Sequence, residues 1–121
     1  MSDLNEAIKQ FYIAHNEIFA GNIAPMQEIW SQSQDVTYMS PIGGILVGYD
    51  AVIKSWRKQA ELNLKGHVEP YEMKIVQGQD IGVCYNYIRG TNYVLDGREV
   101  HPNIRATTVY RNEGESWKVI G

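Results

Sequence analysis

The chain has 121 residues, of which 44% are hydrophobic and 21% are charged, and its formal net charge is −3. This length fits one domain over residues 1–121, and the mixed charges, which form no basic stripe, exclude the usual nucleic-acid binders. No apolar run is long enough to cross a membrane, and Met1–Gln10 does not resemble a signal peptide. Because Cys84 is the only cysteine, no internal disulfide can form. We therefore expect a soluble, cytoplasmic protein.

The first third of the chain has the pattern of two helices. Asp3 followed by Glu6 fits a capping box, and apolar residues then recur at helical spacing as far as Phe19. Gly21 ends this run, and Pro25 is placed to open a short second helix.

The rest of the chain predicts one further helix and a sheet. Residues 35–40 alternate as a strand, and a third helix is expected between Gly48 and Gly66. Alternation of period two then predicts four antiparallel strands, at 68–77, 81–93, 99–111 and 116–120. The dipeptide Asp96-Gly97 is a strong hairpin signal.

This order of elements predicts an α+β fold. Three helices cannot cover both faces of a four-stranded antiparallel sheet. The sheet is therefore expected to curve strongly around the N-terminal helices and to leave one end open, which makes a cone with a mouth.

Several local motifs resemble the nuclear transport factor 2-like superfamily over nearly the whole chain. They are Phe19–Asn22, Asp35–Pro41, Gly48–Val52, and the closing pair Arg105–Arg111 and Gly114–Val119. The last pair is similar to the SnoaL-like branch, which also includes ketosteroid isomerases. The resemblance implies a cystatin-like cone around a ligand-binding pocket and a homodimer formed through the convex face of the sheet.

The positions that carry ketosteroid isomerase chemistry differ here. That reaction needs a carboxylate base, a tyrosine and a protonated acid. The resemblance aligns these three groups with Ser40, Ala14 and Thr107, respectively. None of these residues can perform the required step, so we expect no isomerase of the usual mechanism.

A second local resemblance concerns the segment Cys84–Tyr93, which is similar to the association domain of calcium/calmodulin-dependent kinase II. In that domain arginines inside the pocket bind small carboxylates, and one of them matches Arg89. A second aligns on Thr108, and Arg105 is an alternative source. The isomerase alignment turns Thr107 inward, whereas the association-domain alignment turns Thr108 inward, and the sequence leaves both open.

These arguments give a set of expected site residues. The ligand pocket is predicted to be lined by Tyr38, Ser40, Trp56, Tyr87, Arg89, Asn103, Arg105 and Thr107. His15 is either a neutral core histidine or an acid/base, and His101 faces either the pocket or the convex side. Three dispersed histidines and one cysteine predict no metal site, and we expect no cofactor.

Three functions fit this pattern. The first is a pocket protein that binds an organic anion or an oxygenated cyclic compound. The second is an enzyme of the cyclase, hydratase or isomerase type that uses His15 or His101. The third is an oligomeric association module, in which assembly is the function and the pocket is secondary.

Overall fold

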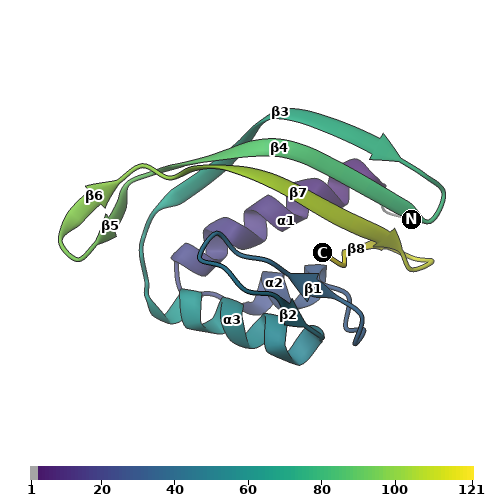
Figure 1. Cartoon of the computed structure of the whole chain (residues 1–121), viewed down its shortest axis with the longest axis horizontal. Coiled ribbons are helices and arrows are strands. Elements are labelled where there is room, and N and C mark those ends of the chain that lie inside the picture. The colour runs from purple at the N-terminus through teal and green to yellow at the C-terminus, as the bar shows by residue number, and fades with distance from the viewer. Residues whose placement is uncertain (1–2) are drawn as a thin grey trace.

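A curved antiparallel sheet lies over three helices in the computed structural model, which describes residues 3–121 (Figure 1). The strands run in the order β3-β4-β7-β8, with the bounds His67–Gln77, Ile81–Thr91, Asn103–Asn112 and Trp117–Val119. All three helices lie on the concave side of the sheet (Figure 1). The predicted α+β fold with a curved sheet is therefore confirmed.

The helices are α1 (Leu4–Phe19), α2 (Ala24–Ile29) and α3 (Tyr49–Glu61). The backbone N–H of Glu6 donates to Asp3 Oδ1 over 2.7 Å, so the predicted cap of α1 forms. The third helix ends at Glu61, before the predicted stop at Gly66, and Asn63 and Lys65 beyond it have positive φ angles of 48° and 59°. None of the helices in residues 3–121 has the length and apolar character that a bilayer crossing requires.

The strand predicted at 35–40 is reduced to β1 (Thr37–Tyr38), which pairs with an unpredicted β2 (Leu46–Val47). Between them Gly43 and Gly44 adopt φ angles of 107° and 76°, which only glycine takes up readily. These glycines reverse the chain, so the predicted strand becomes one half of a small hairpin.

The two long strands predicted at 81–93 and 99–111 are each interrupted. Asn92 has a φ of 60°, and beyond it β5 (Tyr93–Leu95) and β6 (Arg98–Val100) form a separate hairpin. Both turn residues, Asp96 and Gly97, have positive φ, as the predicted tight turn requires. This hairpin projects from one end of the molecule (Figure 1).

Close packing determines which face of β4 points towards the helices. A Cβ atom on Gly82 would lie 2.5 Å from the Leu4 side chain, and one on Gly90 would lie 2.5 Å from the Tyr93 ring. A larger residue at either position would force the Leu4 side chain or the Tyr93 ring to move. Residues of the same parity, including Cys84 and Ile88, are therefore buried, whereas the intervening residues lie on the convex face.

Candidate functional site

A cavity of about 330 Å³ opens on the concave side of the sheet. This volume is at the lower end of the range for small-molecule sites. Residues from α1, α3, β4, β7 and the β1–β2 hairpin border the cavity, together with the residue after α2 and the last residue of the chain. They are Phe11, His15, Trp30, Thr37, Tyr38, Met39, Ser40, Pro41, Trp56, Ile88, Ile104, Arg105, Ala106, Thr107, Thr108 and Gly121.

One wall of the cavity is aromatic. The rings of Tyr38 and Trp56 are stacked, with centroids 4.9 Å apart and planes at 16°. The His15 ring is nearly perpendicular to the rings of Trp56 and Phe11, with centroids 5.0 Å and 4.4 Å away, respectively. The Tyr38 hydroxyl accepts a hydrogen bond from Gln59 Nε2 over 3.3 Å, and burial raises the pKa of Tyr38. The wall is therefore neutral and suited to a flat ring.

The protonation state of His15 decides whether this aromatic wall carries a positive charge. Its Nδ1 lies 3.0 Å from the carbonyl oxygen of Phe11. Because a carbonyl oxygen only accepts hydrogen bonds, Nδ1 carries the proton and Nε2 has the free lone pair. Burial lowers the pKa of His15 from 6.5 to about 4, so the ring is neutral at pH 7.

Behind His15 lies a buried polar pair. Tyr12 stacks on His15 with centroids 5.2 Å apart, and its hydroxyl accepts a hydrogen bond from Asn86 Nδ2 over 2.9 Å. Burial raises the pKa of Tyr12 to about 12. This pair, which contacts His15 through the Tyr12 ring, consists of groups that stay uncharged at neutral pH.

The prediction that Tyr87 and Arg89 line the cavity is wrong. Both are exposed on the convex face of β4, where Arg89 Nε donates to Glu69 Oε1 over 2.6 Å. The guanidinium also lies 4.6 Å from the centroid of the Tyr71 ring. Arg89 is thus paired and partly covered on the outer surface, and no ligand anion is needed to explain it.

The predicted placement of the Asn103, Arg105 and Thr107 side chains in the cavity is also corrected by the structure. Arg105 pairs with Tyr87 across the ladder, and residues directly opposite each other share a face of the sheet. The side chains of this set therefore lie on the convex face, although Arg105 and Thr107 border the cavity as parts of the strand. Thr108 is the buried threonine, as the association-domain alignment required.

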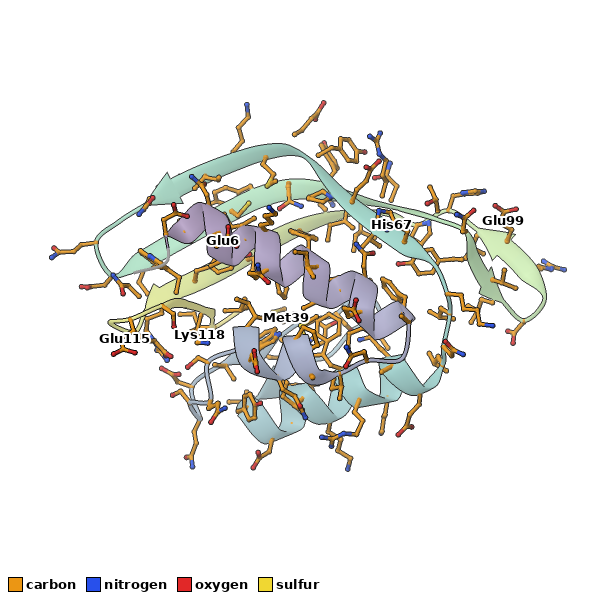
Figure 2. All side chains as sticks on the ribbon, turned by 180° about the vertical axis from the view of Figure 1, so that it is seen from behind. Glu6, Met39, His67, Glu99, Glu115 and Lys118 are labelled. Atoms are coloured by element: carbon orange, nitrogen blue, oxygen red, sulfur yellow. The ribbon has the colours of Figure 1, made fainter. Side chains whose placement is uncertain are left out.

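The remaining predicted residues fall into two groups. Tyr38, Ser40, Trp56 and His15 all lie on the cavity wall. His101 is exposed and lies 3.6 Å from Glu99, which is on the projecting hairpin far from Met39 at the cavity border (Figure 2). His101 therefore takes no part in the cavity.

Sequence reasoning missed several wall residues, namely Phe11, Trp30, Ile88, Ile104 and Ala106. The sequence feature of those on β4 and β7 is that Gly82 and Gly90 have matching parity, but this parity marks the closely packed face only once the contacts of the glycines with Leu4 and Tyr93 are known. Ala14, aligned with the isomerase tyrosine, is completely buried. Within residues 3–121, neither an Asp nor a Glu borders the cavity, and no cluster of three possible metal ligands occurs.

Comparison with known proteins agrees with this geometry. Residues 4–120 match the model of a family described as SnoaL-like domain. A search among curated proteins found no match.

Solved structures resemble the chain over almost its full length. A Thiobacillus denitrificans protein, proposed to be a calcium/calmodulin-dependent protein kinase type II association domain, has a TM-score of 0.83 at 22% identity, covering 99% of this chain and 91% of that one. A proposed dehydratase of the NTF2-like family from Streptomyces avermitilis has a TM-score of 0.83 at 16% identity, covering 97% and 88%. A Caulobacter vibrioides protein with a cystatin-like fold has a TM-score of 0.73 at 16% identity, covering 96% and 84%. The cystatin-like fold is therefore shared.

Proposed function

The chain belongs to the SnoaL-like domain family, and on this premise we propose that it binds a small, neutral, oxygenated cyclic compound in the cavity of its cone. The observation that carries the proposal is the stacked wall of Tyr38 and Trp56 beside the neutral ring of His15. Aromatic walls favour a flat ring, and a single polar group gives it an orientation.

The positions of the arginines argue against an organic anion as the ligand of this cavity. Arg89 is paired with Glu69, and Arg105 turns its side chain to the convex face. Within residues 3–121, Arg105 is the only Lys or Arg that borders the cavity, and its side chain lies on the convex face. A carboxylate would lose its hydration there without gaining a partner, which is unfavourable.

Thermal unfolding with added ligand tests the proposal. Naphthol and tetralone are suitable neutral cyclic probes, and benzoate is the anionic one. A ligand at about 100 times its Kd adds about 2.7 kcal/mol to the free energy of unfolding, a shift in Tm on the order of 10 °C. We expect such a shift with a neutral probe and none with benzoate.

Two leucine substitutions on β7 distinguish a probe that binds in the cavity from one that binds on the outer surface. Ala106 borders the cavity, so Ala106→Leu is expected to abolish the shift by filling it. Asn103 lies on the convex face of the same strand, and Asn103→Leu should leave the shift unchanged. Equal shifts in both variants would show that the probe binds elsewhere.

The second candidate function is an enzyme that uses His15 as a base. His15 Nε2 is unprotonated at neutral pH, and a dehydratase has been proposed among the structural relatives. A pKa of about 4 gives the imidazole little driving force to take a proton, however, because efficient bases have a pKa near the working pH. Binding is therefore the better supported function.

We also propose that two copies of the chain pair through the convex face of the sheet. Val76, Ile81, Tyr85 and Tyr87 are exposed there, and Tyr71 stacks on Tyr87 with centroids 5.2 Å apart. An exposed apolar surface of this kind is typical of a protein interface. The structural relative proposed as an association domain also favours assembly.

Sedimentation velocity measures directly how many chains the assembly contains. We expect twice the mass of one chain for the wild type and a single-chain mass for Tyr87→Glu, because the new carboxylate would be buried in the interface. Ile13→Glu is the control, since Ile13 is an exposed apolar residue on α1. A wild-type monomer would contradict pairing, and a ring of many copies would favour the association module.

A further inference from the structure

We propose, building on the binding function above, that the cavity selects ligands carrying a hydroxyl group, which donates a hydrogen bond to Nε2 of His15. The ligand class is then a hydroxylated cyclic compound, a phenol or a cyclic alcohol, and not a ketone or an ether of the same shape.

The first step is the position of the imidazole proton. His15 Nδ1 is 3.0 Å from the Phe11 carbonyl oxygen, one helical turn earlier, and must donate to it. In the neutral ring this leaves Nε2 as an acceptor. Among residues 3–121, the hydrogen bond of Nδ1 to Phe11 is the only one that the imidazole makes, and the His15 side chain is half-buried. Because His15 borders the cavity, Nε2 is the nitrogen available to a ligand there.

The second step is the rigidity of the ring. His15 is stacked on Tyr12 at 5.2 Å and meets the rings of Phe11 and Trp56 edge to face at 4.4 Å and 5.0 Å. Turning the ring over would break the hydrogen bond to the Phe11 carbonyl. The lone pair of Nε2 is thus held in one direction before a ligand arrives, which lowers the entropic cost of binding.

The third step is the discrimination itself. A hydroxyl group can donate to Nε2, whereas a carbonyl or ether oxygen can only place its own lone pairs against that of Nε2. A site built around a hydrogen bond rejects the analogue that cannot make it, because the polar group in the site then stays unpaired. Two ligands of equal shape are therefore distinguished by whether they can donate a hydrogen bond to Nε2.

The neighbours of His15 keep the acceptor uncharged. Tyr12 on α1 stacks on His15, and Tyr38 on β1 borders the same cavity; burial raises the pKa of both hydroxyls. Arg105 also borders the cavity, but its side chain lies on the convex face. The other rings against it, Phe11 and Trp56, carry no charge. Because the pKa of His15 is about 4, the preference for hydroxyl compounds should hold at any pH between about 5 and 8.

Calorimetric titration with naphthol and methoxynaphthalene tests the inference, because the two share one ring system and differ in the hydroxyl proton. For the wild type we expect naphthol to bind about tenfold more tightly. His15→Asn keeps an amide donor near Nδ1 but lacks Nε2, and should bind both compounds equally. His15→Gln places an amide oxygen near Nε2 and should recover part of the preference.

The outcomes separate the two proposals. If neither compound binds the wild type, the proposed binding function fails, and this inference with it. If both bind with equal affinity, the binding function stands and the inference alone is overturned. Should His15→Asn fail to fold, the wild type still decides: naphthol, but not its ether, must move the nitrogen-15 resonance of His15 Nε2. An unchanged resonance with bound naphthol overturns the inference.

Discussion

Replacing Trp56 by alanine is expected to lower the free energy of unfolding by about 3–5 kcal/mol. Trp56 is 2% exposed, its ring stacks on Tyr38, and it meets the His15 ring nearly at a right angle. Alanine removes these contacts and leaves a space that the surrounding strands and helices can fill only in part. In a chain of this size the loss corresponds to a decrease in Tm on the order of 10–20 °C.

Urea unfolding of matched variants measures this effect. Met39→Ala is the control, because Met39 borders the same cavity but is 73% exposed. It should change the free energy of unfolding by less than about 0.5 kcal/mol. Trp56→Phe retains an aromatic ring and should fall between the two. A loss below about 1 kcal/mol for Trp56→Ala would mean that the aromatic wall contributes little to the fold.

Lowering the pH from 7 to 4 should destabilise the protein by up to about 3 kcal/mol through His15 alone. In the unfolded chain the pKa of this side chain is 6.5, whereas burial lowers it to about 4 in the folded state. Between these values the unfolded state binds more protons, so the free energy of unfolding falls as the pH falls. The contribution is fully present above pH 6.5 and is lost as the pH approaches 4.

The difference between wild type and His15→Phe isolates this contribution. The variant has no proton to take up at this site, so its free energy of unfolding should decline less over the same range. His67→Phe is the control, because His67 is exposed on β3, and it should follow the wild type. Arg111 lowers the pKa of Asp35 to about 2, so the contribution of that carboxylate is lost in a separate window, below about pH 4. Parallel curves for wild type and His15→Phe would contradict the neutral, buried state of His15.

Much of the local structure follows from neighbouring residues. The cap at Asp3, the apolar stripe of α1 and the turn at Asp96-Gly97 each depend on contacts within a few residues, and all three form as expected. The strand at 35–40 was overestimated because alternation gives no information on where a partner strand ends, whereas the glycines at 43 and 44 reverse the chain within a short hairpin.

The sequence by itself determined the fold and the parity of each strand, that is, which residues share a face. Only the tertiary structure decided which face is concave, since a shift of one residue exchanges the two faces completely. Both faces of β4 are apolar enough to be buried, because Tyr85 and Tyr87 alternate with Cys84 and Ile88. The close approach of Leu4 to Gly82 and of Tyr93 to Gly90 settled the choice, and it placed Arg89 outside the cavity.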